Sequence, residues 1–194
     1  MFLENAFDPS REPVNVYGAP EVLESVQRHI FNGVIWPDFV KLSIGGHPLV
    51  RLVPLSEESA IQIEALTIVP VAVHHVVPTY GYIVSDNQAT VVFGADSGPT
   101  ERIWQLARKA NGPISVFLEA CFPDELSQLA TISGHLTPSM FAGEVRKLPE
   151  AKTIVATHIK AGFHERVVNE LMALRIPGLV IGDAAHEYEF GEQS

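Results

Sequence analysis

The sequence predicts an α/β fold in which mixed sheets are covered by helices. Two observations carry this prediction: the first half of the chain is rich in strands, and from Thr100 onward helices and strands alternate. A third observation is that polar side chains stand where several of the predicted strands end. With 194 residues the chain is long enough for one substantial core. We therefore expect a single domain over residues 1–194, with a loosely held tail over residues 183–194.

The first half begins with one strand and one helix. Residues 13–17 (PVNVY) predict a short strand, and apolar residues at helical spacing predict a helix over residues 22–30. Residues 31–39 (FNGVIWPDF) contain a glycine and a proline and predict a loop that buries aromatic side chains. Further strands are expected over residues 48–55, 61–75, 82–85 and 89–93, which alternate or run apolar and contain many β-branched residues.

In the second half of the chain, predicted helices and strands alternate. Gly98 and Pro99 turn the chain out of a strand and into a helix that begins near Thr100. Helices are expected over residues 100–110, 124–132, 137–148 and 163–174, and strands over residues 114–119, 153–157 and 179–181.

Composition and charge exclude several classes of partner. No apolar stretch approaches the roughly 20 residues that a membrane span needs, so no membrane partner is expected. The chain has 13 Lys and Arg against 23 Asp and Glu, a formal net charge of -10, and no basic stripe. Tight binding of long nucleic acid is therefore disfavoured. A small anion can still bind to an acidic protein if metal ions supply local positive charge.

Cysteine usage and the first residues bear on the cellular setting. The single cysteine, Cys121, excludes an internal disulfide framework and a Cys-rich zinc site. Residues 1–5 (MFLEN) do not have the basic and then apolar pattern of a signal peptide. Both features favour a reducing, cytoplasmic setting.

Candidate metal ligands stand at the ends of predicted strands. His74 and His75 end an apolar run, Asp96 follows a strand in Ala-Asp-Ser-Gly-Pro, and His158 follows TIVAT. The carboxyl edge of a sheet is where α/β proteins place ligands. Two imidazoles and one carboxylate suit zinc, manganese or iron. The alternative is structural: a histidine satisfied at the end of its strand, and an aspartate that caps a turn.

The order of these motifs resembles the metallo-β-lactamase superfamily. The segments that carry the resemblance are His75 six residues before Gly81-Tyr82, Gly-Ala-Asp96-Ser-Gly-Pro-Thr, Leu-Glu119-Ala-Cys-Phe, Gly-His135-Leu-Thr and Ala-Thr-His158-Ile. Within the superfamily the chain is most similar to class II 3',5'-cyclic-nucleotide phosphodiesterases, whose loop resembles residues 31–39. The tRNA 3'-processing endonucleases share the later motifs. The resemblance covers about residues 13–181 and implies an αββα sandwich.

The resemblance implies a two-metal site. His75 would bind one metal ion, Asp96 would bridge two, and His158 would bind the second, with Zn²⁺ expected and Mn²⁺ or Fe as alternatives. His74 replaces His75 if the strand register differs by one residue. Two metal ions would generate hydroxide and clamp the oxygens of an in-line displacement at phosphorus.

The resemblance also implies roles for residues beyond the metal ligands. His135 would be the general acid that protonates the departing sugar oxygen, and Glu119 would orient it. Asn32, Trp36 and Phe39 are the expected substrate-binding residues, with the two aromatic rings stacking on a purine. The alternative for these rings is that they pack the loop onto the core.

One departure from the family pattern bears on activity. The superfamily's principal metal motif, His-x-His-x-Asp-His, is absent, and no histidine precedes His29. The chain therefore resembles a family member that lacks its first strands and motif loop, either through truncation or through loss of the site. Because His75, Asp96, His135 and His158 are present, truncation is the favoured explanation. We expect this chain alone to bind metal weakly.

The sequence thus predicts the C-terminal portion of a hydrolase whose complete form cleaves a small cyclic nucleotide such as 3',5'-cAMP. One alternative is a tRNA 3'-processing-type or other hydrolase of the same fold, against which the net charge of -10 argues. Another is a catalytically inactive scaffold or subunit that pairs through an exposed sheet edge, for instance as a homodimer.

Overall fold

A computed structural model describes residues 12–44, 47–110, 112–148 and 151–190, and the chain divides into two units, residues 1–56 and 57–194. Each unit has its own apolar core. The expectation that residues 1–194 form one domain stays a prediction. No helix among the described residues is long and apolar enough to cross a membrane.

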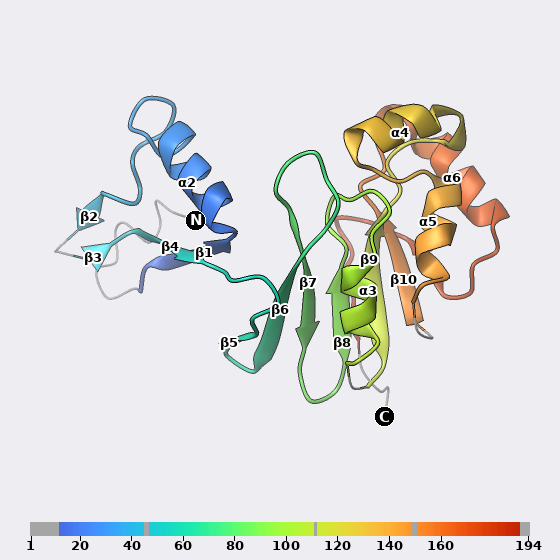
Figure 1. The fold of residues 1–194 in the computed structure, drawn as a ribbon, viewed down its shortest axis with the longest axis horizontal. Helices are drawn as coiled ribbons and strands as arrows, with labels where there is room; N and C mark the ends of the chain where they lie inside the picture. Colours follow the sequence, from blue (N-terminus) through green and yellow to red (C-terminus); the bar gives the residue numbers. More distant parts are fainter. Residues whose placement is uncertain (1–11, 45–46, 111, 149–150, 191–194) are drawn as a thin grey trace. The chain divides into compact units, whose positions relative to one another are not determined.

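The first unit pairs two parallel strands beside one helix (Figure 1). Strand β1 (Val14–Gly18) lies parallel to β4 (Val50–Pro54), and the helix α2 (Pro20–His29) follows β1. A short antiparallel pair, β2 (Ser43–Ile44) and β3 (His47–Pro48), precedes β4. Proline at the first helical position fits the start of α2, because its missing N–H would have no partner there.

The second unit is built on a mixed seven-stranded sheet with the order β11-β10-β9-β8-β7-β6-β5. Its strands are β5 (Ile61–Ile63), β6 (Leu66–Ala72), β7 (Tyr80–Ser85), β8 (Thr90–Phe93), β9 (Ile114–Glu119), β10 (Ala151–Thr157) and β11 (Leu179–Ile181). Pairing is antiparallel from β5 to β8 and parallel from β8 to β11. The carboxyl ends of β8, β9 and β10 therefore lie together at one edge of the sheet.

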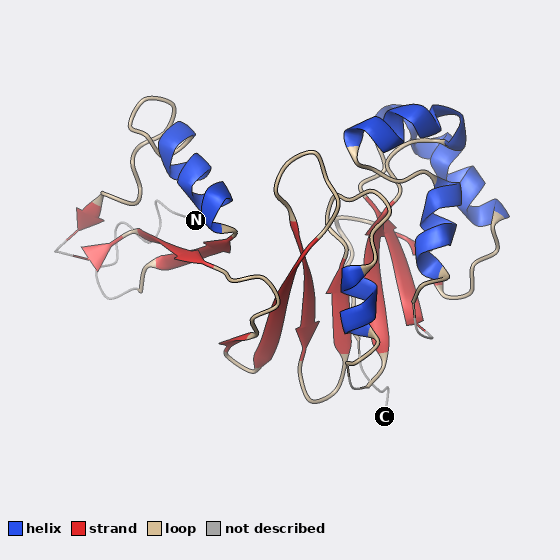
Figure 2. Ribbon diagram, in the orientation of Figure 1, coloured by secondary structure: helices blue, strands red, loops and turns tan. Residues whose placement is uncertain are grey.

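Helices pack on one face of this sheet (Figure 2). They are α3 (Arg102–Ala107), α4 (Ser127–Ser133), α5 (Pro138–Val145) and α6 (His164–Ala173), with 3-10 turns at Asp124–Leu126 and Ala161–Phe163. Because side chains alternate along a strand, Ile114, Val116 and Leu118 of β9 share a face, and all three belong to the core of this unit. Helix residues Phe141 and Leu171 complete that core.

Aromatic side chains from the C-terminal segment pack on the opposite face. Phe117 of β9 stacks on Phe93 of β8 with ring centroids 5.0 Å apart. Tyr188 and Phe190 meet the Phe117 ring edge-on at 5.4 and 5.8 Å. The tail expected to be loosely held spans residues 183–194. Its described part, residues 183–190, includes Tyr188 and Phe190 and so makes these ring contacts, and residues 191–194 lie outside the described residues.

The predicted α/β class with mixed strands and covering helices is confirmed, but one predicted strand is wrong. Residues 61–75 form two strands, β5 and β6, which pair antiparallel about a turn where Glu64 has a φ of 53°. The run has no glycine or proline between 61 and 69, and Gln62 and Glu64 fit the alternation of a single strand, so nothing in its local sequence marks the turn. Strand β6 ends at Ala72, and His74 and His75 lie in the loop that follows it.

Candidate functional site

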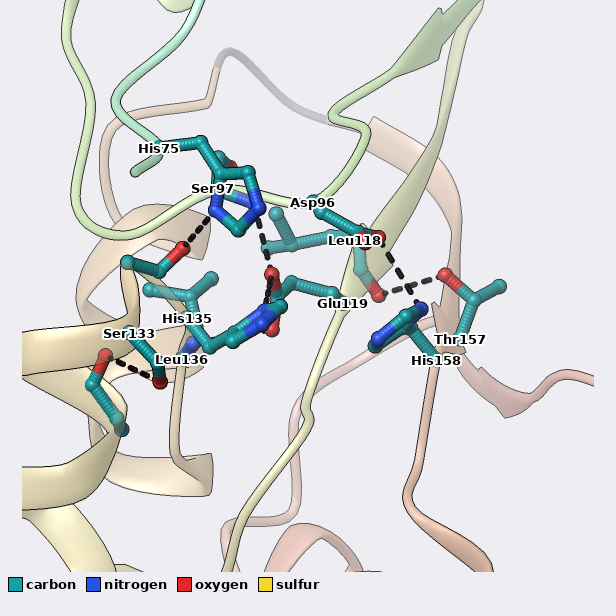
Figure 3. A network of polar contacts seen from close by, with 12 residues as sticks. His75, Asp96, Ser97, Leu118, Glu119, Ser133, His135, Leu136, Thr157 and His158 are labelled. Atoms are coloured by element: carbon teal, nitrogen blue, oxygen red, sulfur yellow. Dashed lines mark hydrogen bonds and ion pairs between the residues drawn. The ribbon is translucent and has the colours of Figure 1, made fainter. Parts of the chain in front are cut away.

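The candidate site lies where β8, β9 and β10 end. Asp96 follows β8, Glu119 is the last residue of β9, and His158 directly follows β10. Figure 3 shows these side chains close to His135 and His75, which come from two other loops. Three neighbouring parallel strands thus deliver polar groups to one edge, which is the usual position for a ligand site in an α/β sheet.

Left-handed backbone turns two of these side chains toward each other. Ala95 has a φ of 55° and His158 a φ of 54°, a conformation that costs a residue with a Cβ roughly 1–2 kcal/mol. After these turns, Asp96 Oδ1 lies 3.1 Å from His158 Nδ1. Both side chains are partly exposed, at 42% and 34%. The two side chains therefore lie within contact distance of each other and remain open to solvent.

Glu119 is a buried carboxylate with three hydrogen-bond partners. Its side chain is fully enclosed, Oε1 accepts from Ser97 N at 2.7 Å, and Oε2 accepts from Leu136 N at 3.0 Å. The third partner is His135, whose Nδ1 lies 2.7 Å from Oε1. Burial raises the pKa of Glu119 to about 7, although the hydrogen bonds from the two amides lower it. This carboxyl can therefore exchange a proton near neutral pH.

His135 stands between the other two histidines. It follows Gly134, which ends α4 with a φ of 68°, and its N–H donates to Ala130 O at 2.8 Å. Its ring stacks on His158 at a centroid distance of 5.4 Å and meets the edge of His75 at 4.9 Å. Burial, together with the neighbouring His75, lowers the pKa of His135. With Nδ1 held by Glu119, the Nε2 atom is the nitrogen left for a substrate or a metal ion.

The structure distinguishes His75 from His74. His75 Nδ1 lies 2.9 Å from Gly134 O, and its ring contacts His135. His74 is next to Gly98 instead, where its carbonyl accepts from the Gly98 amide at 2.8 Å. His75 is thus the member of the pair that reaches His135. Its role as a metal ligand stays a prediction.

A different set of side chains meets the geometry of a metal site. Cys121, His135 and His158 each offer one ligand atom within 4.8 Å of the other two, and in the described part of the chain they are the group of three or more that does so. The predicted set of His75, Asp96 and His158 does not form such a group there. Thiolate and imidazole suit Zn²⁺, so the residues present fit the metal ion that the sequence predicts.

The place of Cys121 beside these histidines is not among the predictions from the sequence, where the single cysteine only excludes disulfides and Cys-rich sites. Its position two residues after Glu119 is an available signal, because alternate residues of an extended segment share a side. Cys121 is fully buried, and burial raises the pKa of its thiol to about 12.

A pocket of about 300 Å³ opens beside Asp96 and His158. Its other lining residues are Phe93, Ala95, Phe117 and Thr157. A larger hollow of about 560 Å³ lies along residues 161–170 and contains none of the site side chains. We assign the smaller pocket to the site because it joins the polar pair to an apolar wall.

The expected substrate-binding residues belong to the first unit. Asn32 Oδ1 accepts from Val34 N and Ile35 N at 2.9 and 3.0 Å, so its side chain shapes a turn. Phe39 is 4% exposed and packs edge-on against Phe31 at 5.5 Å, which is the packing alternative stated from the sequence. Trp36 is 57% exposed. Substrate contact by Asn32, Trp36 and Phe39 stays a prediction.

Together, the mixed sheet and the Asp, Glu and His side chains at its carboxyl edge define an α/β protein with a metallo-β-lactamase-like fold. Residues 2–159 match the beta-lactamase superfamily domain, and the chain belongs to this superfamily. A search of curated proteins found no significant match.

Similar solved structures agree on the fold. Unliganded yeast PDE1 superposes with a TM-score of 0.74 at 19% identity, over 92% of this chain and 60% of that one. The metallo-β-lactamase fold protein YhfI from Bacillus subtilis gives 0.66 at 18%, over 87% and 61%. Zn²⁺-bound PqqB from Methylobacterium extorquens gives 0.64 at 14%, over 93% and 65%. The chain thus spans about three fifths of the length of these proteins, and the similarity shows the fold alone.

Proposed function

We propose that this chain belongs to a metal-dependent phosphodiesterase, an enzyme that hydrolyses 3',5'-cyclic nucleotides such as cAMP. The observation that carries the proposal is the pairing of Glu119 with His135, next to Asp96 and His158, at the ends of three parallel strands. The similarity in fold to yeast PDE1, a class II cyclic-nucleotide phosphodiesterase, supports it.

Each of the site residues would have a separate role in hydrolysis. His75, Asp96 and His158 would hold the two metal ions. When bound, these ions supply a Lewis acid for a phosphoryl oxygen and a nucleophile at neutral pH. His135 donates a proton from Nε2 to the departing sugar oxygen, while Glu119 holds Nδ1 and so fixes the direction of the ring. Burial lowers the pKa of His135, which makes the protonated ring a stronger acid toward an alkoxide.

Size and charge favour a small substrate. The pocket of about 300 Å³ lies at the lower end of the range for small-molecule sites. Its apolar wall, Phe93 and Phe117, suits a base, and its polar side suits a phosphodiester. A protein of net charge -10 repels an RNA chain far more than it repels a monoanionic cyclic nucleotide.

Turnover of 3',5'-cAMP by the whole chain, with Zn²⁺ or Mn²⁺ present, tests the proposal, and a structured RNA serves as the competing substrate. Because the chain alone is expected to bind metal weakly, we expect hydrolysis of cAMP that requires excess metal ion and falls by about 10²- to 10⁴-fold in His135→Ala. His164→Ala, at an exposed histidine outside the site, is the control and should retain turnover. Cleavage of the RNA without cleavage of cAMP would support the processing-enzyme alternative. Absence of both activities would support the inactive-subunit alternative, and either result overturns the proposal.

A further inference from the structure

We propose that Cys121, His135 and His158 together bind a single thiophilic divalent metal ion such as Zn²⁺. This ligand set differs from the His75, Asp96 and His158 set that the sequence predicts. Its test follows metal coordination and needs no phosphodiesterase activity, but a metal ion bound by this set excludes the general-acid role proposed for His135 above.

The three ligand atoms lie close to coordination distance. They are within 4.8 Å of one another, whereas Zn–S and Zn–N bonds of about 2.3 and 2.0 Å in a tetrahedral site place ligand atoms roughly 3.3–3.6 Å apart. Side-chain rotations that move each atom by about 1 Å close this difference.

Backbone hydrogen bonds hold Cys121 between the two histidine-bearing segments. The Cys121 amide donates to the carbonyl of Leu136, the residue after His135, at 2.9 Å. The Cys121 carbonyl accepts from the amide of Lys160, two residues after His158, at 3.3 Å. The Cys121 backbone is therefore held beside both histidine-bearing segments, and side-chain rotations can bring the ligand atoms together without rearrangement of the loops.

Each histidine is also oriented by a carboxylate. Glu119 Oε1 lies 2.7 Å from Nδ1 of His135, and Asp96 Oδ1 lies 3.1 Å from Nδ1 of His158. A carboxylate on one ring nitrogen directs the other nitrogen to the metal ion and makes it more basic. The two rings lie almost parallel, at 16° and a centroid distance of 5.4 Å. In this arrangement Asp96 orients a ligand rather than serving as one.

The ligand types of Cys121, His135 and His158 determine which metal ion the site prefers. A thiolate and two imidazoles favour Zn²⁺ over Mg²⁺ or Ca²⁺, which prefer oxygen ligands. Cys121 gives up its thiol proton to solvent when its sulfur coordinates the ion. A water molecule would complete the four ligands of a tetrahedral site, and the His158 side chain, 34% exposed, leaves solvent within reach. While His135 is a ligand, it cannot act as a general acid.

Titration of the metal-free chain with Co²⁺ under reducing conditions tests the ligand set. Coordination by sulfur gives a near-ultraviolet thiolate-to-cobalt charge-transfer band, and because the chain has one cysteine this band can arise only from Cys121. We expect the band to grow as Co²⁺ is added and to saturate at one bound Co²⁺ per chain, to vanish on addition of Zn²⁺, and to persist on addition of Mg²⁺. Co²⁺ binding without the band, or no binding, overturns the proposal.

Variants separate the two ligand sets. Cys121→Ser and Cys121→Ala should lose the band and weaken Co²⁺ binding by more than 10-fold, with circular dichroism used to show that they fold. Asp96→Asn should keep the band and weaken binding by about 10- to 100-fold, as expected for an orienting residue. His164→Ala is the control and should bind as the original chain does. Unchanged affinity in both Cys121 variants, or loss of all binding in Asp96→Asn with an intact fold, overturns the proposal in favour of the predicted set.

Discussion

Glu119 Oε1 lies 2.7 Å from His135 Nδ1 and also accepts the Ser97 amide at 2.7 Å. Ser97 belongs to the loop after β8, Glu119 to the end of β9, and His135 to the loop after α4. One buried carboxylate thus joins three segments that are distant in sequence. Its removal should affect the stability of the whole unit as well as the site.

Glu119→Ala should lower the free energy of unfolding by about 2–4 kcal/mol, because it leaves the buried amides of Ser97 and Leu136 without partners. Glu119→Gln keeps an acceptor oxygen and should cost less. Urea denaturation measures both. Glu125→Ala, which removes an exposed ion pair with Arg166, is the control and should change stability by less than about 1 kcal/mol. Equal effects of Glu119→Ala and Glu125→Ala would contradict the structural role of Glu119.

Glu144, a second buried carboxylate, should also contribute to the free energy of unfolding. Glu144 of α5 is 2% exposed, accepts from Trp104 Nε1 at 2.7 Å and from Thr100 N at 3.2 Å, and pairs with Lys147 at 2.7 Å. Glu144→Ala leaves Lys147 without this partner and should cost about 3–5 kcal/mol, whereas Trp104→Phe, which removes one hydrogen bond, should cost about 1 kcal/mol beyond the change in packing. Thermal and urea unfolding measure both, and a cost for Glu144→Ala no larger than that for Trp104→Phe would contradict the prediction.

Gly134→Ala should disturb the position of His75. Gly134 has a φ of 68°, and a Cβ there would lie 3.0 Å from His75 Nδ1 and 3.1 Å from His75 Cα. The backbone penalty alone is about 1–2 kcal/mol. The imidazole resonances of His75 should shift in NMR spectra, and the unfolding free energy should fall. Gly162→Ala, where nothing lies within 4 Å of the added carbon, is the matched control, and a shift of equal size in that variant would refute the prediction.

Asp124 should contribute stability that depends on pH. Its carboxylate accepts from the amide and hydroxyl of Ser139, at 2.8 and 2.6 Å, at the start of α5. Burial raises the pKa of Asp124, but the Ser139 hydrogen bonds outweigh it, so that the pKa lies below its usual 3.8. A lowered pKa means that the folded state prefers the ionised form. The stabilisation is therefore present above pH 3.8 and is lost as pH falls through the folded pKa.

Unfolding measured from pH 6 down to pH 2.5 checks this expectation. The original chain should exceed Asp124→Asn in stability by about 1 kcal/mol near pH 6, as for other carboxylates at helix starts, and the difference should shrink in acid. Ser139→Ala keeps the carboxylate but removes the hydroxyl, so its deficit should shrink in the same way. A deficit that stays constant across this range would contradict the assignment.

The sequence predicted the parts of the fold that local patterns determine. β-branched runs marked β9 and β10, and polar residues directly after strands marked Asp96 and His158. The division of residues 61–75 into two strands was not visible, because Glu64 makes a left-handed turn without a glycine to mark it. The register of His74 and His75 also depended on where β6 ends.

Long-range contacts explain what the sequence could not show. Glu144 has the spacing of an ordinary polar helix residue, and its burial depends on Trp104, 40 residues away. Cys121 joins the histidines because of backbone hydrogen bonds to Leu136 and Lys160, which no local pattern encodes. His135 and Glu119 were predicted through the family resemblance, and the structure adds their direct contact.

The left-handed backbone at Ala95 and His158 has a further consequence. Its conformational penalty is incurred when the chain folds, so a ligand that binds afterward finds Asp96 and His158 already in place and loses little entropy in ordering them. A glycine at position 95 would relieve the strain and favour the folded state, yet it would let the Asp96 loop sample more orientations. Stability and binding should therefore respond in opposite directions to that one exchange, which is the trade-off expected of a preorganised site.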